Sequence, residues 1–370
     1  MSLYYPQFEV ARGNPARARL RSMAPEALQV GQIRLRVDCF ALTANNATYA
    51  LLGERFQYFD FFPSGASAYA LVPVWGYAQV IESMHPEVAV GERLYGFLPM
   101  AAQCVITPTK LSPQRMFDGA PHRAQLPAVY QWLQRLGRDA AAAADLLRPV
   151  LQPLALTAFL LREEVAALDP QAGRPLLMSS ASSKTAMATA WMFRRDHDRP
   201  RPRLLGLTSA AHLQAVRAQG LFDAVEPYDA LAESPLIEAG SAPILLDFAG
   251  NAALRDTVHR RGGPDSLSLL IGLTHGLGAA AGQVDAAAAE TPRSEQLFFA
   301  PSVAVECIKT WGAEAFGERS EAAWQGLRQH FEDRIALHQG IGGEAIAQAW
   351  HRVLEGELAP ECAELLRFAG

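Results

Sequence analysis

The sequence predicts an α/β protein in which a β-rich domain is followed by a domain built on a parallel sheet. The first hundred residues contain many short apolar runs separated by turn residues. After residue 174, apolar runs alternate with helix-forming stretches of about ten residues. The length of 370 residues exceeds what one hydrophobic core usually holds. Together these observations predict two domains.

The β-rich part is expected to form a small barrel or sandwich. Residues 32–41 alternate polar and apolar side chains, which is the period of a half-buried strand. Further strands are predicted at 72–81, 93–97 and 103–106. Residues 127–147 are rich in Ala, Leu, Arg and Gln, and this composition predicts one or two surface helices.

The second part is expected to form a doubly wound sheet. Its apolar runs are continuous rather than alternating, as in parallel strands covered by helices on both faces. Ligands bind beyond the carboxyl ends of such strands, so the residues that follow each run are the candidates for a site. Small or hydroxyl-bearing residues follow four of the runs: Ser179 to Thr185, Thr208 and Ser209, Asp247 to Asn251, and Leu273 to Gly276. Residues 298–370 follow a helical pattern.

The first of these turns is rich in serine. A dinucleotide-binding turn normally reads Gly-x-Gly-x-x-Gly, which lets the backbone approach the diphosphate at a helix N-terminus. Serines permit a fairly close approach and add donors, but they lose the freedom of glycine at positive φ. The structural alternative is a serine-rich helix cap. An ATP-binding P-loop is disfavoured because Met178 and Ser183 stand at its two glycine positions.

Composition excludes several classes of function. The net charge is −5 and no long basic run is present, so no nucleic-acid partner is expected. The four cysteines lie far apart, and none forms a Cys-x-x-Cys pair typical of zinc sites. No signal-peptide pattern and no apolar run long enough to span a bilayer is present. We therefore expect a cytoplasmic protein that acts on a small molecule, without a metal and away from membranes.

Several motifs together resemble one superfamily, the medium-chain dehydrogenase/reductases. They are ALTANNATYALLGE (41–54), FDFFP (59–63), VPVWGYAQV (72–80), VGERL (90–94), SSASSKTA (179–186), GLTS (206–209), DFAGN (247–251) and LFFAP (297–301). The resemblance covers nearly the whole chain. It is closest to a bacterial domain-of-unknown-function family within the zinc-free, quinone-oxidoreductase-like branch. The zinc branch carries a Gly-His-Glu motif and a four-cysteine lobe, and this sequence has neither.

The resemblance implies a fold and a domain order. A GroES-like β-barrel substrate domain would occupy residues 1–150, with a helical insertion near 113–149. A Rossmann cofactor-binding domain would follow in residues 151–300. The helices of residues 301–370 would return to the substrate domain. Members of the superfamily often dimerise, so a homodimer is possible.

The resemblance also implies NADPH as the cofactor. The diphosphate would be bound at the serine-rich turn and the next helix, by Ser180, Ser182, Ser183, Lys184 and Thr185. Thr208 and Ser209 end the second strand without the carboxylate that binds the ribose of NADH. His212 and Tyr228 match the positions that hold the 2′-phosphate in zinc-free quinone reductases, although His212 replaces a lysine. The nicotinamide half would contact Ala249, Gly250, Leu273 and Thr274.

Four residues are candidates for contact with the substrate. His275 follows a strand that should pass beneath the nicotinamide, and it could donate a proton or hydrogen bond. The alternative for His275 is a loop histidine bonded to the backbone. Asn45, Asn46 and Tyr49 could hold the oxygen of an enone or quinone, although asparagine is also common in turns. Four further residues, Tyr58, Phe59, Phe61 and Phe62, either line an apolar substrate pocket or belong to the core. Asp247 is interpreted as structural.

The leading hypothesis is an NADPH-dependent oxidoreductase that transfers hydride to an enone, quinone or carbonyl without a metal. A first alternative is an enzyme acting on an acyl thioester, with the segment 127–147 making room for a carrier. A second alternative is a non-catalytic relative that binds a nucleotide without turnover.

Overall fold

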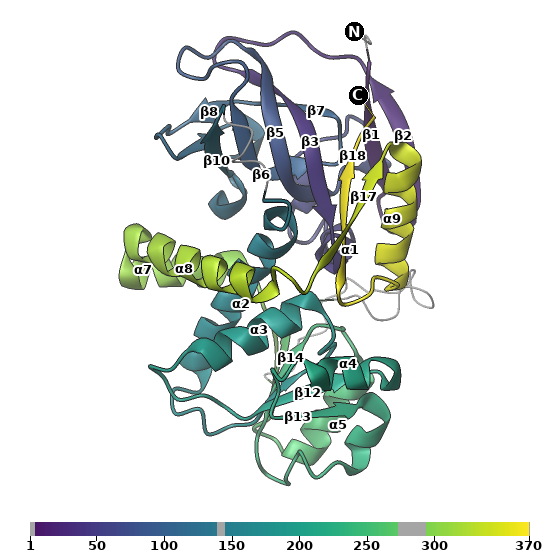
Figure 1. The fold of residues 1–370 in the computed structure, drawn as a ribbon, viewed down its shortest axis with the longest axis vertical. Coiled ribbons are helices and arrows are strands. Elements are labelled where there is room, and N and C mark those ends of the chain that lie inside the picture. Colours follow the sequence, from purple (N-terminus) through teal and green to yellow (C-terminus); the bar gives the residue numbers. More distant parts are fainter. Residues whose placement is uncertain (1–3, 139–144, 273–293, 370) are drawn as a thin grey trace. The chain divides into compact units, whose positions relative to one another are not determined.

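The computed structural model describes residues 4–138, 145–272 and 294–369 (Figure 1). The chain divides into two units. Unit 1 combines Met1–Val150 with Asp333–Gly370, and unit 2 is Leu151–Glu332. Each unit has its own sheets.

Unit 1 is built mainly on antiparallel strands. In β3 (Ile33–Leu42), Ile33, Leu35 and Val37 are buried at every second position, the spacing that places side chains on one face. β3 pairs antiparallel with β5 (Pro73–Ser83), and β5 pairs with β6 (Arg93–Pro99). These strands were expected from the sequence.

The main sheet of unit 1 has nine strands, with the order β17-β18-β3-β5-β6-β10-β9-β8 and with β7 paired to β3. A smaller sheet has the order β2-β1-β4. The remaining elements of the unit are β1 (Tyr5–Ala11), β2 (Asn14–Met23), α1 (Ala44–Leu51), η1 (Tyr58–Asp60), β4 (Tyr69–Ala70), β7 (Gln103–Ile106), β8 (Pro108–Thr109), β9 (Arg115–Asp118), η2 (Pro121–Arg123), η3 (Ala128–Tyr130), β10 (Trp132–Gly137), β17 (Ala336–Ile341), α9 (Gly343–Glu355) and β18 (Cys362–Arg367).

The prediction of helices in residues 127–147 is wrong for the part of that segment that the structure describes. Only the single turn η3 is helical, and β10 follows it as a strand. β10 pairs with both β6 and β9. These ladder hydrogen bonds outweigh the helix propensity of the composition, which is a weak preference.

The end of the chain also differs from the expected run of helices. After residue 333 the chain forms β17, then α9, then β18, and β17 and β18 pair in parallel. β18 continues into the main sheet of unit 1 through β3. Residues 301–332 were expected to return to the substrate domain, whereas in the structure they belong to unit 2 and the return begins at Asp333.

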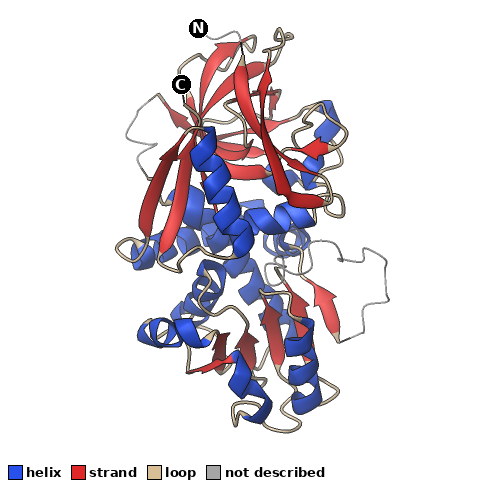
Figure 2. Ribbon diagram, turned by 90° about the vertical axis from the view of Figure 1, so that its right-hand side faces the viewer, coloured by secondary structure: helices blue, strands red, loops and turns tan. Residues whose placement is uncertain are grey.

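Unit 2 contains a six-stranded parallel sheet with the order β13-β12-β11-β14-β15-β16, and helices flank this sheet (Figure 2). The order reverses at β11, which pairs with β12 on one side and β14 on the other. Its elements are α2 (Arg148–Leu168), β11 (Leu176–Met178), α3 (Lys184–Arg195), β12 (Leu204–Thr208), η5 (Ala210–His212), α4 (Leu213–Ala218), β13 (Ala224–Pro227), η6 (Tyr228–Glu233), β14 (Ile244–Asp247), α5 (Ala252–Gly262), β15 (Leu267–Leu270), β16 (Glu295–Leu297), α7 (Ala300–Trp311) and α8 (Ala313–Phe331).

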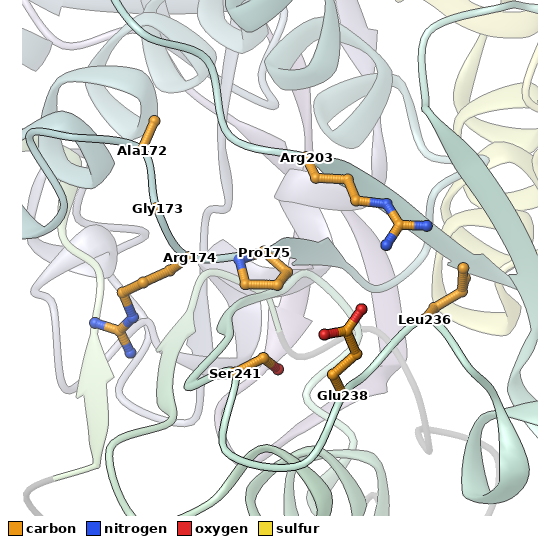
Figure 3. A pocket seen from close by; sticks show the side chains of 8 residues that line it. All are labelled: Ala172, Gly173, Arg174, Pro175, Arg203, Leu236, Glu238 and Ser241. Carbon is orange, nitrogen blue, oxygen red and sulfur yellow. The ribbon is translucent and has the colours of Figure 1, made fainter.

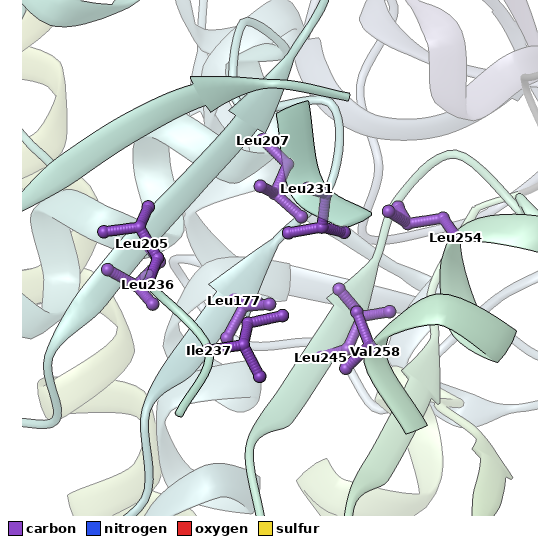
Figure 4. Close-up of a cluster of buried hydrophobic side chains, with 9 residues drawn as sticks. All are labelled: Leu177, Leu205, Leu207, Leu231, Leu236, Ile237, Leu245, Leu254 and Val258. Carbon is purple, nitrogen blue, oxygen red and sulfur yellow. The ribbon is translucent and has the colours of Figure 1, made fainter. Parts of the chain in front are cut away.

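A cluster of buried aliphatic side chains packs on one face of this sheet (Figure 4). Strand residues meet residues of η6, its following loop and α5, and Tyr228 packs against the cluster. Full burial of a leucine contributes on the order of 1.5–3 kcal/mol, so the cluster holds the strand ends in fixed positions. Its members are Leu177, Leu205, Leu207, Leu231, Leu236, Ile237, Leu245, Leu254 and Val258.

Candidate cofactor site

The turn between β11 and α3 carries a serine in a left-handed conformation. Ser180 has φ +46°, a region that favours glycine because it crowds Cβ. Its N–H donates to the Tyr228 hydroxyl at 2.7 Å, and its carbonyl accepts from the Ser183 N–H at 2.7 Å. The surrounding contacts therefore impose on Ser180 the backbone geometry that the glycine-rich motif usually supplies.

Ser183 caps α3. Its extended backbone precedes the helix, and its hydroxyl accepts from the Ala186 N–H at 3.2 Å. The first turn of the helix contains no acidic residue, and Lys184 stands at its first position. A cation there opposes the helix dipole unless an anion is near. Ser183 therefore acts as a helix cap, which was the structural alternative for this turn. The positive charge of Lys184 at the start of the helix would still favour a bound phosphate.

Hydroxyl and imidazole groups meet at the carboxyl ends of β11 and β12. The Ser182 Oγ lies 3.4 Å from the Thr208 Oγ1 and 3.5 Å from the His212 Nδ1. The His212 Nδ1 also lies 3.2 Å from the Ser209 Oγ. Four predicted residues, from the end of β12 and the segments that follow β11 and β12, therefore lie together. None of the four carries a carboxylate that would repel a 2′-phosphate.

Gly206 permits this close approach, and no role for it was predicted beyond its place in the motif GLTS (206–209). A Cβ at Gly206 would lie 3.0 Å from the Phe222 ring and 3.1 Å from the Ala181 Cβ. The Ala181 N–H donates to the Leu207 carbonyl at 2.9 Å, which ties the serine turn to β12. A larger residue at 206 would push the turn away from the hydroxyl cluster.

Tyr228 completes the cluster from the end of β13. Its ring packs on the aliphatic cluster of Figure 4, and its hydroxyl accepts from Ser180 as described above. Burial raises the pKa of Tyr228 above its usual value of 10.0, and the two hydrogen-bonding interactions with Ser180 lower it in part. The phenol therefore stays protonated at neutral pH.

The end of β14 is held by a buried network of hydrogen bonds, of which the sequence indicated only the structural role of Asp247. The Ser179 Oγ donates to the Asp247 carboxylate at 2.8 Å and accepts from the N–H groups of Phe248 and Ala249. Asp247 Oδ1 also accepts from the Ala249 and Gly250 N–H groups. Asp247 thus fixes the backbone that follows the strand, in agreement with its structural interpretation.

Arg255 closes the network from α5. It donates to the fully buried Asp247 at 2.8 Å and to Glu295 at 3.2 Å. Gly250, at φ +72°, makes the turn into α5, whose cap is the Asn251 side chain. Ser179 was predicted only as one of the small residues of the serine-rich turn, because its partners lie far away along the chain. Arg255 and Glu295 carried no sequence signal.

Three predicted residues lie outside the described residues. They are Leu273, Thr274 and His275. Of the predicted nicotinamide contacts, the structure describes Ala249 and Gly250 only, and the roles of these residues and of His275 stay predictions.

The candidates on α1 of unit 1 have different surroundings. Asn46 is 3% exposed, and its amide oxygen accepts from the Thr43 N–H at 2.8 Å while its NH₂ donates to the Pro73 carbonyl at 2.9 Å. Asn46 therefore caps the helix in a capping box with Thr43. Asn45 is partly exposed and has no hydrogen bond from its side chain within the described ranges. Tyr49 is buried against other aromatic rings.

A pocket of about 290 Å³ lies at the opposite, amino-terminal edge of the unit 2 sheet (Figure 3). It is lined by Ala172, Gly173, Arg174, Pro175, Arg203, Leu236, Glu238 and Ser241. Arg174 holds its rim together by donating to the carbonyls of Ala242 and Asp265. Since dinucleotides bind beyond the carboxyl ends of the strands, this pocket is not the cofactor site. Within the described ranges, no group of three or more His, Cys, Asp or Glu side chains is placed to hold a metal ion. No helix of those ranges is both long and apolar enough to cross a membrane.

Comparison with family profiles gives one match. The profile described as "Protein of unknown function (DUF2855)" matches residues 40–359. The chain belongs to the DUF2855 family. No curated protein matches its sequence.

Solved structures resemble the DUF2855 chain over its whole length. CurA from Vibrio vulnificus has 14% identity and a TM-score of 0.61, and the likeness covers 99% of each chain. CurA in complex with NADPH, from the same organism, has 14% identity, a TM-score of 0.59 and the same coverage. A putative NADPH:quinone reductase from Bacillus thuringiensis has 15% identity, a TM-score of 0.55 and again 99% coverage of each chain. These likenesses confirm the predicted fold, a GroES-like domain with a Rossmann domain.

Proposed function

We propose that the DUF2855 chain is an NADPH-dependent reductase of an enone, quinone or other carbonyl compound. The observation that carries the proposal is the polar cluster of Ser182, Thr208, Ser209 and His212 at the carboxyl ends of β11 and β12, beside the capped N-terminus of α3. The likeness to CurA, whose structure was solved with NADPH, and to the putative NADPH:quinone reductase supports the same cofactor.

The residues present fit a dinucleotide phosphate. Hydroxyl and N–H donors suit the oxygens of a diphosphate, and Lys184 adds a positive charge. At the adenosine end, Ser209, His212 and Tyr228 would hold the 2′-phosphate. Ala249 and Gly250 would contact the nicotinamide half through the backbone that Ser179 and Asp247 hold in place.

Bound NADPH would supply a hydride, which carries two electrons, and would leave as NADP⁺. Negative charge would then develop on the carbonyl oxygen of the substrate. The protein's task is to stabilise that oxygen by hydrogen bonds, and water then supplies the proton that completes the reduction. Asn45 and Tyr49 of α1 are the proposed donors that remain, because the amide oxygen of Asn46 accepts from Thr43 and its NH₂ donates to the Pro73 carbonyl.

Titration calorimetry with NADPH and NADH tests the cofactor assignment. We expect NADPH to bind at least about tenfold more tightly, a difference of about 1.4 kcal/mol. His212→Lys would tighten NADPH binding without tightening NADH binding, because the added charge meets only the 2′-phosphate. His197→Lys is the matched control, since it adds the same charge at an exposed loop of unit 2. Equal effects of the two variants, or no NADPH binding, would contradict the proposal.

Turnover is tested by NADPH oxidation with a panel of enones, quinones and acyl thioesters. The thioester alternative relied on helices in residues 127–147, which the structure replaces in part with β10. We therefore expect free enones or quinones to be the better substrates. Tight NADPH binding with no oxidation across the panel would favour the non-catalytic alternative.

A further inference from the structure

The pocket of Figure 3 lies wholly within unit 2 and shares no residue with the proposed cofactor site. Two of its residues, Pro175 and Arg203, directly precede β11 and β12. Leu236, Glu238 and Ser241 come from the segment between η6 and β14. The volume of about 290 Å³ is close to the lower end of the range for ligand pockets, so the pocket suits a small molecule.

The backbone that frames this pocket is held by hydrogen bonds. The Leu176 N–H donates to the Arg203 carbonyl at 2.9 Å, which joins the start of β11 to the start of β12. On the other wall, Arg261 of α5 donates to the carbonyls of Ser234 and Ile237, at 2.6 Å and 3.2 Å. Both walls of the pocket are therefore fixed by contacts that need no ligand.

Other arginines at this edge of the sheet already have partners. Arg174, which also lines the pocket, donates to backbone carbonyls as described above. In the segment Arg-Pro-Arg-Pro-Arg (199–203), Arg199 and Arg201 each form an ion pair. Arg203 is exposed, and its side chain makes no hydrogen bond or ion pair with the described part of the chain. Its guanidinium group is therefore available to a ligand in the pocket.

Glu238 provides the opposite charge. It is exposed, and its carboxylate also makes no hydrogen bond or ion pair with any residue that the structure describes. Figure 3 shows this carboxylate directed toward the space between Pro175 and Arg203. Arg203 and Glu238 thus line one pocket without pairing with each other. A ligand that carries both signs of charge could bind between them, with each of its ends facing the opposite charge.

We propose that this pocket binds a small zwitterion with an apolar side chain, of the class of the free α-amino acids. The Arg203 guanidinium would donate to the ligand carboxylate, and the Glu238 carboxylate would accept from the ligand ammonium group. Pro175 and Leu236 supply apolar surface for the side chain. A purely anionic ligand would meet the like charge of Glu238, and a purely cationic one that of Arg203. The site is independent of the reductase activity.

Saturation-transfer NMR with three compounds of one carbon skeleton tests the proposal. L-Leucine carries both charges, 4-methylpentanoate lacks the ammonium group, and 3-methylbutylamine lacks the carboxylate. We expect leucine to bind in the millimolar range, as suits a ligand of this size. The two single-charge compounds should bind at least about threefold more weakly, because each loses one charge-assisted hydrogen bond.

Two variants that each remove one charge identify which end of leucine each residue binds. Arg203→Gln should weaken leucine binding at least about threefold but should not weaken binding of 3-methylbutylamine. Glu238→Gln should weaken leucine binding to the same extent but should not weaken binding of 4-methylpentanoate. The matched controls are Arg260→Gln and Glu233→Gln, which remove the same charges from exposed positions of unit 2 outside the pocket. Both controls should bind leucine like wild type.

The NADPH-free chain is used throughout, so the result does not depend on the cofactor proposal. All four substituted residues are exposed, and circular dichroism checks that each variant is folded. Absence of a leucine signal at tens of millimolar would overturn the proposal, as would leucine binding no more tightly than the two single-charge compounds. Leucine binding by Arg203→Gln and Glu238→Gln that equals binding by the controls would place the amino acid elsewhere and overturn it as well.

Discussion

At the scale of the residue, the serine-rich turn shows that one left-handed position decides its conformation. Of residues 179–183, only Ser180 has a positive φ. The lack of glycine's freedom to adopt a positive φ therefore matters at Ser180 alone within this turn. The N–H of Ser180 still reaches the Tyr228 hydroxyl, and a glycine there would keep that N–H.

We expect Ser180→Gly to leave stability unchanged or raise it by up to about 1 kcal/mol, because relief of left-handed strain offsets the greater flexibility of the unfolded chain. Ser182→Gly is the control. Ser182 has no positive φ and contacts Thr208, so that variant should lose about 0.5–1 kcal/mol. Urea unfolding followed by circular dichroism measures both. A Ser180→Gly protein less stable than Ser182→Gly would show that the turn is not strained.

Residue identity predicted part of this site and missed part. Ser182 and Ser209 were predicted because they belong to the turns that follow apolar runs, and parallel strands bring such positions to one edge. His212 was predicted from the resemblance to zinc-free quinone reductases. Ser179 was not assigned a role of its own, because its function depends on partners more than sixty residues away along the chain. No local pattern reports such contacts.

At the scale of the element, the join between β11 and β14 depends on Ser179. Its hydroxyl makes three hydrogen bonds in a buried site, to Asp247 and to the N–H groups of Phe248 and Ala249. Ser179→Ala leaves these groups less well satisfied and should lower the free energy of unfolding by about 1–3 kcal/mol. Ser183→Ala, which loses one capping bond, should cost about 1 kcal/mol. Equal losses in urea unfolding would argue against the network.

His259 of α5 links that helix to β15 and predicts a pH dependence. Its Nε2 lies 2.8 Å from the Ser268 Oγ. Burial lowers the pKa of His259 below 6.5, Glu295 and Asp256 raise it in part, and Arg255 lowers it. The unfolded chain then binds a proton at higher pH than the folded chain. The contribution to stability is therefore complete above about pH 6.5 and decreases as the pH falls through and below that value.

Unfolding at pH 7.5 and pH 5.5 checks this expectation. Wild type should lose more stability between the two values than His259→Gln, which cannot take up the proton. His197→Gln, at an exposed loop position, should behave like wild type. If His259→Gln loses as much stability as wild type, His259 does not contribute to the pH dependence.

Elements were predicted well where burial on both faces leaves a clear sequence pattern. β11, β12, β14 and β15 are continuous apolar runs, and each was expected. β17 was missed because most of its side chains are exposed, so that its sequence lacks both an apolar run and an alternation. β10 was missed because pairing with β6 and β9 overrides a helix-forming composition.

At the scale of the whole molecule, all of the proposed cofactor-binding residues that the structure describes belong to unit 2, which has its own sheet and core. A ligand that binds only the folded state stabilises it by about 2.7 kcal/mol at a concentration of 100 Kd. NADPH at that concentration should therefore raise the unfolding temperature of unit 2 directly. Unit 1 should respond only as far as its unfolding is coupled to that of unit 2.

Calorimetry can separate the two responses if each transition is first assigned with a variant. Ser179→Ala should lower the unfolding temperature of unit 2. Asp118→Asn breaks the buried ion pair with Arg123 and should lower the unfolding temperature of unit 1. Adenosine 2′,5′-bisphosphate should reproduce much of the NADPH shift, because it carries the 2′-phosphate expected at Ser209 and His212, whereas 5′-AMP should not. A shift confined to the unit 1 transition would place the nucleotide away from the serine turn, and the polar cluster would then be a structural cap without a phosphate to bind.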